Sequence, residues 1–287
     1  MRILRKAGAA FAALVAAAAV GLAAAAWSTG TEIDALHARV ALAGAGAPSP
    51  RWPGAAQLEA LPAPVRRWVA YTFASPGVRV SHVEVEMAGR FRRPGATAFH
   101  DTTARQTIAA GTPALAFDAS TSVIPGIGAR AFDAFVDGRM TMKARVLSAF
   151  TVVDEHSTPA LDRTSLRRWL IEASFVPVAL LPGGPLRWEP IDDRRALAIA
   201  RLAGVEARMV ATFADDGRLV SFDAQEDGDL SLPYHGSGER VERSDERLVM
   251  GMRIPHGFVY SRVAAGRADP FWEGRLTRVR VASQQAR

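Results

Sequence analysis

The chain has 287 residues, with 35 lysines and arginines, 29 acidic residues and no cysteine. Without a thiol it forms no disulfide or thiolate metal site, and it has neither a cysteine nucleophile nor a lipidated cysteine anchor. Half of the net charge of +6 comes from Arg2, Arg5 and Lys6. The other basic residues are interspersed with acids, as in residues 239–243. This pattern is typical of a solvated surface and argues against a nucleic-acid partner.

Residues 1–31 have the features of a membrane-targeting segment. The basic head precedes the uncharged stretch from Ala7 to Ala26, and no charged residue follows until Glu32. At about 1.5 Å per residue, a helix over residues 7–26 spans a hydrocarbon core of roughly 30 Å. The basic head orients the segment with its N-terminus in the cytoplasm. We therefore expect the bulk of the chain in the periplasm, held at the inner membrane through residues 7–26.

The same segment leaves two fates open. Thirteen of its 20 central residues are alanine, which makes a weak membrane span, and Ala24 and Ala26 form an A-x-A cleavage pattern before Trp27. The segment is either a retained signal anchor or a signal peptide that is cut, which would release the protein into the periplasm.

Residues 32–56 connect this segment to the folded part of the chain. Thr31 to Leu42 is expected to form one short helix, and Ala43 to Gly54, rich in Ala, Gly and Pro, a linker. A single β-rich exported domain is expected over residues 57–287. It begins with a helix in which Val65, Trp68, Val69 and Thr72 recur at helical spacing, before Ser75-Pro76-Gly77 ends it.

Most of the remaining chain alternates apolar and polar residues with the period of a β-strand. Residues 129–136 and 140–146 flank Asp137-Gly138, the strongest hairpin signal in the chain. Residues 207–213 and 219–224 flank Asp216-Gly217 in the same way, and a strand over 196–202 precedes them. About ten strands are expected. A helix from Asp162 to Ser174 lies between these two β blocks.

The short turns favour antiparallel pairing, because parallel strands need long crossover connections. We therefore expect an α+β protein with a large, twisted, curved antiparallel β-sheet. Two or three helices cover its concave face, and a membrane helix precedes it.

Four motifs resemble the signature of a bacterial family of domains of unknown function. They are LPxPVRRW at 61–68, RWLxE at 168–172, Pro177 with LLP at 180–182, and Trp188. The resemblance covers about residues 57–281, and members typically carry an N-terminal membrane segment. It implies no activity. The overall pattern is also similar to that of curved-sheet periplasmic lipid and lipoprotein carriers, which is an analogy of fold alone.

Glu172 is the one candidate for acid–base chemistry. A half-buried carboxylate at the edge of a helix stripe has the setting of a general acid or base. The structural alternative is an ion pair with Arg168 or with an arginine of the sheet. Asp154-Glu155-His156 places two carboxylates beside an imidazole, but adjacent residues of a strand point to opposite faces. The six histidines show no metal-ligand spacing, so neither a metal nor a cofactor is expected.

The candidates for contact with a ligand are apolar. Ser122 to Gly128 is a glycine-bearing loop whose Ile124 and Ile127 either close over a cavity or pack down on the sheet. Trp68, Trp169 and Trp188 are core anchors or the wall of a site for an acyl chain. With Glu172, these residues form the predicted ligand-binding set.

Three functions are consistent with these features. The leading hypothesis is a membrane-anchored periplasmic module that binds a hydrophobic small molecule or lipid. The alternative is a structural or protein-interaction module of the cell envelope, which predicts a packed core and an exposed apolar patch. The third is a hydrolase that uses Glu172 with a second carboxylate.

Overall fold

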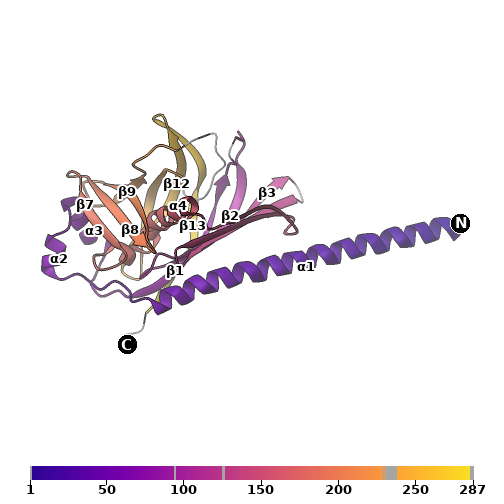
Figure 1. Ribbon diagram of the computed structural model, residues 1–287, viewed down its shortest axis with the longest axis horizontal. Coiled ribbons are helices and arrows are strands. Elements are labelled where there is room, and N and C mark those ends of the chain that lie inside the picture. The colour runs from indigo at the N-terminus through magenta and orange to yellow at the C-terminus, as the bar shows by residue number, and fades with distance from the viewer. Residues whose placement is uncertain (1, 94, 125–126, 229, 231–237, 285–287) are drawn as a thin grey trace.

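A computed structural model describes residues 2–93, 95–124, 127–228, 230 and 238–284. Its centre is one 13-stranded antiparallel sheet, as the alternating pattern predicts, with three strands more than the sequence indicated (Figure 1). The strands are β1 (Val80–Phe91), β2 (His100–Ala109), β3 (Leu115–Ile124), β4 (Ile127–Val136), β5 (Arg139–Val146), β6 (Phe150–His156), β7 (Leu186–Pro190), β8 (Arg195–Leu202), β9 (Val205–Phe213), β10 (Leu219–Asp223), β11 (Arg240–Val249), β12 (Met252–Ala264) and β13 (Arg267–Ser283).

The order of the strands is simple. The sheet runs β6-β5-β4-β3-β2-β1-β13-β12-β11-β10-β9-β8-β7, so every neighbour is the next strand in the chain except at the central β1–β13 pair. Strands β6 and β7 therefore lie at opposite edges. The chain between them must cross the whole sheet, and it does so over the concave face as α4 (Pro159–Glu172), η1 (Ala173–Phe175) and η2 (Pro177–Leu180).

The tight turns follow the chemistry that the sequence predicts. Asp137 and Gly138 have φ of 56° and 76°, the left-handed values that a two-residue hairpin turn requires. Ala203 and Gly204 adopt the same geometry between β8 and β9. In both turns the strand register follows without a shift.

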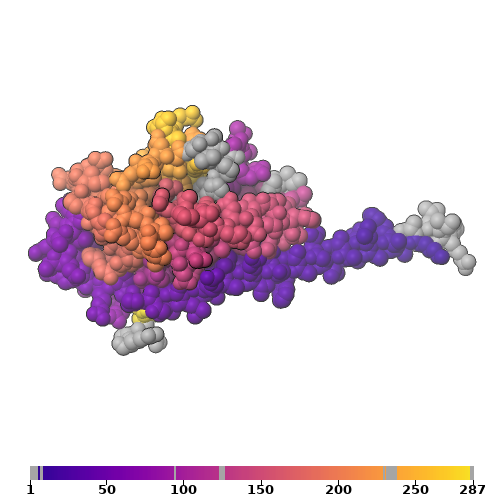
Figure 2. Space-filling model, in the orientation of Figure 1, coloured from indigo at the N-terminus to yellow at the C-terminus, as the bar shows by residue number. Residues whose placement is uncertain are grey.

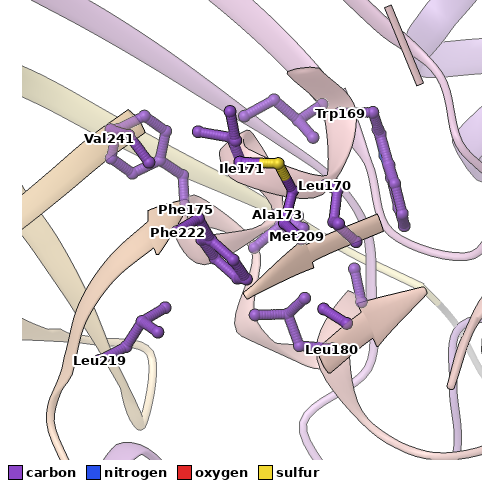
Figure 3. Packing of buried hydrophobic residues seen from close by; sticks show 14 of the residues in the cluster. Trp169, Leu170, Ile171, Ala173, Phe175, Leu180, Met209, Leu219, Phe222 and Val241 are labelled. Carbon is purple, nitrogen blue, oxygen red and sulfur yellow. The ribbon is translucent and has the colours of Figure 1, made fainter. Parts of the chain in front are cut away.

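Two helices fill one side of the concave face, as expected. In α3 (Ala63–Thr72) the buried side chains are Pro64 and the four residues of the predicted stripe. Thr158 caps the N-terminus of α4, where its side chain accepts a hydrogen bond from the Leu161 N–H, and most residues of the helix are buried. Figure 3 shows Trp169, Leu170 and Ile171 of α4 gathered in one cluster with Met209, Leu219, Phe222 and Val241 of the sheet. This half of the fold is a packed core.

The N-terminal helix differs from the prediction. A single helix, α1, runs from Arg2 to Gly46, so the expected short helix at 31–42 is continuous with the apolar N-terminal segment. The linker is correspondingly shorter and contains a small helix, α2 (Ala55–Glu59). No proline or glycine pair interrupts residues 26–42, and packing against the sheet supports the second half of the helix.

Helix α1 lies on the convex face, opposite α3 and α4. Its buried residues are Thr29, Ile33, His37, Val40 and Gly44, which recur at steps of three or four and form one stripe. Val40 packs among alanines of β2, β3 and β4. A Cβ on Gly44 would lie 2.4 Å from the Ser81 carbonyl oxygen, so only glycine permits this approach. The N-terminal half of α1 extends beyond the domain as an isolated helix (Figures 1 and 2). The window from Ala9 is long and apolar enough to cross a membrane, as an anchor or a signal segment does.

Candidate functional site

The concave face is not filled over β1–β5, where an apolar cavity of about 90 Å³ remains. Its walls are Met87, Phe91, Phe117, Ala119, Ala131, Met142, Phe271 and Trp272. Thr102, Gln106, Thr121, Asp133, Arg168, Glu172 and Tyr260 complete the lining. The lining residues that keep part of their surface exposed, among them Phe91, Thr121 and Met142, mark its open side. The α4 segment covers the other side, so the cavity is a pocket between sheet and helix.

Gln106 is the unusual residue of this pocket. Its side chain is fully buried, yet among the described residues neither its amide nitrogen nor its amide oxygen has a hydrogen-bond partner. A buried amide without partners destabilises a fold by about 1–3 kcal/mol. An unmet donor and acceptor that line an apolar pocket point to a polar group that is supplied from outside the chain.

An ion-pair network lies at the inner end of the pocket and involves Glu172. Its Oε2 accepts hydrogen bonds from the Tyr260 hydroxyl at 2.6 Å and from Arg243 Nη2 at 3.2 Å. The same Arg243 nitrogen donates to the Tyr260 oxygen at 3.0 Å, and its guanidinium lies 4.1 Å from the centre of the Phe175 ring. Both structural partners predicted for Glu172 are therefore present, since Arg168 Nε is 3.8 Å from its Oε1.

A second pair adjoins this network. Arg168 Nη1 lies 2.7 Å from Asp133 Oδ2, and its guanidinium stacks at 4.4 Å on the ring of Phe117. Burial raises the pKa of the Asp133 carboxyl, although the charge of Arg168 opposes the shift. Burial, together with the neighbouring Glu172, also raises the pKa of the Tyr260 hydroxyl well above its ordinary value. Tyr260 therefore acts as a hydrogen-bond donor, and two carboxyls face two guanidinium groups.

Of the predicted ligand-binding set, the structure places Glu172 in the pocket lining. Trp68 and Trp169 are 3% and 0% exposed within the core, where Trp169 donates a hydrogen bond to the Ala109 carbonyl. Trp188 is partly buried against the same core and donates to the Leu180 carbonyl. A ligand-binding role of the three tryptophans stays a prediction.

The loop predicted at 122–128 is a hairpin in which Ile124 pairs with Ile127. Pro125 and Gly126, at its centre, lie outside the described residues. Ile127 lies on a separate groove at the outer face of the sheet. A role of Ile124 and Ile127 in ligand binding therefore also stays a prediction.

Asp154, Glu155 and His156 lie on the edge strand β6. His156 Nε2 is 3.4 Å from Asp154 Oδ1, and both side chains are about half exposed or more. Within the described ranges no three histidine or acidic side chains are arranged to hold a metal ion.

Gln106 was not identified from the sequence, although the alternation of β2 contains the signal. Ala104 and Ile108 flank it two residues away on each side and are buried, so the pattern places the amide on the apolar face.

Comparisons with known proteins give a family and one distant structure. The model of a family of unknown function, DUF6920, matches residues 59–280. No curated protein matches. The crystal structure of a LolA superfamily protein from Nitrosomonas europaea is similar at 8% identity and a TM-score of 0.33, over 79% of this chain and 95% of that chain.

Proposed function

We propose that this chain, which belongs to the DUF6920 family of unknown function, is a membrane-anchored module that binds a neutral amphiphile in the pocket between β1–β5 and α4. The observation that carries the proposal is Gln106, a buried amide without a partner on the wall of an apolar pocket. A bound head group that both donates and accepts would satisfy both atoms of the amide.

The charges around the pocket favour a head group without charge. Asp133 pairs with Arg168 and Glu172 pairs with Arg243, so the inner end is already balanced. A further carboxylate or ammonium would lose its hydration there and add a charge that these two ion pairs do not balance, at a cost of several kcal/mol. Hydroxyl or amide heads, such as those of monoacylglycerols, fatty alcohols and acyl amides, meet the hydrogen-bonding need without that cost.

The size of the pocket limits how the ligand binds. A volume of about 90 Å³ is below the roughly 150 Å³ that holds benzene, so a complete acyl chain does not fit. The head group and the first carbons enter, and the rest of the chain leaves past the exposed edges of Phe91 and Met142.

The anchor is proposed from the continuity of α1. A cut after Ala26 would fall inside one unbroken helix, three residues before Thr29 binds the sheet. Intact-mass measurement of protein purified from membranes tests this: a chain that retains residues 1–26 is expected, and a product that begins at Trp27 would overturn the anchor.

Ligand binding is tested by titrating the full chain, held in amphipol, with 1-decanoylglycerol and separately with decanoate. Trp272 lines the pocket, so the fluorescence difference between wild type and Trp272→Phe reports occupancy. The neutral ligand is expected to bind at least about tenfold more tightly than the acid, because the acid brings an unpaired charge. Equal or tighter binding of decanoate would overturn the assignment of a neutral head group.

Gln106→Leu is the decisive variant, because it keeps an apolar side chain of similar size and removes both polar atoms. It is expected to weaken 1-decanoylglycerol binding by about tenfold, the value of one or two buried hydrogen bonds. The matched control, Gln225→Leu, makes the same change at an exposed position and should bind like wild type. Unchanged affinity in Gln106→Leu would remove the basis of the proposal.

A further inference from the structure

A second hollow lies on the opposite face of the sheet, beside α1. It is an open groove of about 920 Å³ whose basic lining residues are Arg90, Arg130 and Arg275. Asp101 is the only acidic side chain among the described residues that line it. This groove shares no basic or acidic residue with the pocket on the concave face.

The strand register explains why a groove forms there. Arg275 of β13 is opposite Ala88 of β1, Ala88 is opposite Thr103 of β2, and Thr103 is opposite Ser120 of β3. Ser120 in turn is opposite Arg130 of β4. Three small residues thus form a floor between two long arginines, about four strand spacings of ~4.8 Å apart.

The arginines of the groove retain free hydrogen-bonding capacity. Arg130 Nη2 is 3.3 Å from Asp118, but its buried Nε has no partner among the described residues. Arg275 is exposed and pairs with no described carboxylate within 4.0 Å. After the hydrogen bond from Arg247, the positive charge of Arg275 adds to the lowering of the pKa of Asp245. Arg90 pairs with Glu273 at the surface. Guanidinium forks and the Thr103 and Ser120 hydroxyls are the donors that bind phosphate oxygens.

The groove also lies at a defined level relative to the apolar segment. Ser148 lines it, and its carbonyl accepts a hydrogen bond of 2.9 Å from the Thr29 hydroxyl of α1. Thr29 follows Ala26 by three residues, a rise of about 4.5 Å along the helix. This is the depth of the lipid head groups. Two large apolar side chains at the same level, Trp27 and Phe150, are 75% and 61% exposed, as expected at a membrane interface.

We infer that this groove binds the phosphate-bearing head group of an anionic lipid in the bilayer that α1 crosses. The inference requires the anchor and does not depend on the amphiphile in the concave pocket. On this inference α1 has two roles: it crosses the bilayer, and by packing on the sheet it holds the groove at the level of the lipid head groups.

The test uses the full chain in neutral detergent micelles with an equimolar mixture of phosphatidylglycerol and phosphatidylcholine, and native mass spectrometry of the lipids retained. Wild type is expected to retain phosphatidylglycerol preferentially. Each arginine near an anionic surface contributes about fivefold, so Arg90→Ala with Arg275→Ala should reduce that retention by about 25-fold.

The matched control is Arg278→Ala with Arg280→Ala. These arginines lie on the same strand, opposite Glu86 and Glu84, and both are 56% exposed outside the groove. The control is expected to retain phosphatidylglycerol like wild type. Equal loss in both double variants would show a general effect of charge and overturn the site. Wild-type retention of phosphatidylglycerol by the groove variant would also overturn the site. Displacement of the lipid by inorganic phosphate at a similar concentration would assign the groove to free phosphate instead.

Discussion

His37 of α1 lies 3.0 Å from the carboxylate of Asp118 on β3, through its Nε2, while its Nδ1 is 2.7 Å from the Thr107 hydroxyl. The ring joins α1 to the centre of the convex face. Arg105 Nε and Arg130 Nη2 approach the same carboxylate at 3.1 and 3.3 Å. The docking of α1 therefore rests on a buried charged cluster as well as on the apolar contacts of Val40.

This cluster predicts that docking of α1 is sensitive to acid. Burial alone would raise the pKa of Asp118, but the hydrogen bond with His37 and the charge of Arg105 outweigh it and lower the pKa below its ordinary 3.8. A carboxyl whose pKa is lowered by folding stabilises the fold above its unfolded pKa, and this contribution is lost as the pH falls through the folded value. The protection factors of the β2 and β3 amides, which compare exchange with its intrinsic rate at each pH, are expected to fall below about pH 4.

Asp118→Asn should remove much of that acid-induced change, because the side chain no longer titrates. Asp193→Asn, at an exposed position, should leave the profile of wild type. A profile for Asp118→Asn that matches wild type would show that the acid response arises elsewhere.

The contact between Thr29 and Ser148 predicts a specific cross-link. The chain has no cysteine, so Thr29→Cys with Ser148→Cys creates the only thiol pair. A short bismaleimide is expected to join them in high yield, because the two residues share a hydrogen bond of 2.9 Å. Leu42→Cys with Ser148→Cys is the control, since residue 42 lies about 20 Å further along the helix. The cross-linked chain is closed into a loop and its mobility shifts on denaturing electrophoresis, which measures the yield in each variant. Similar yields would mean that α1 is not held in one register.

The elements of this fold differ in how far local sequence determines them. The hairpin at Asp137-Gly138 and the stripe of α3 follow from local chemistry, and both have the expected bounds within a few residues. The position of α1 could not be predicted. The spacing of its buried residues indicates a helix. His37 and Asp118, however, are 81 residues apart, and only the strand register places their side chains together.

The candidate functional residues show the same limit. Glu172 was identified because it stands at the edge of a helix stripe, and its partner Arg243 lies 71 residues away on β11. The groove arginines come from three strands, so no spacing in the sequence relates them. Gln106 is the exception, because its alternation with Ala104 and Ile108 is local.

The network of Glu172 predicts a large effect of truncation on stability. Glu172→Ala leaves Arg243, whose side chain is fully buried, without its carboxylate, and removing one partner of a buried ion pair costs about 3–5 kcal/mol. Glu172→Gln should cost less, since its amide oxygen still accepts the hydrogen bond from Tyr260. Glu189→Ala, which breaks a half-exposed pair with Arg187, is expected to change stability by about 0–1 kcal/mol. Urea unfolding of the three variants measures the free energies, and equal small effects would show that the buried pair is not needed.

Gln106 predicts an opposite relation between stability and binding. Because both polar atoms of its amide are buried without a partner, Gln106→Leu removes an unfavourable desolvation term and adds apolar contact with the pocket walls. The ligand-free variant should therefore be more stable than wild type by about 1–3 kcal/mol in urea unfolding. Gln225→Leu, at the surface, should change stability by less than about 0.5 kcal/mol. A loss of stability in Gln106→Leu would mean that the amide is satisfied in the free protein, by water for example, and that the pocket does not need a ligand to complete its hydrogen bonds.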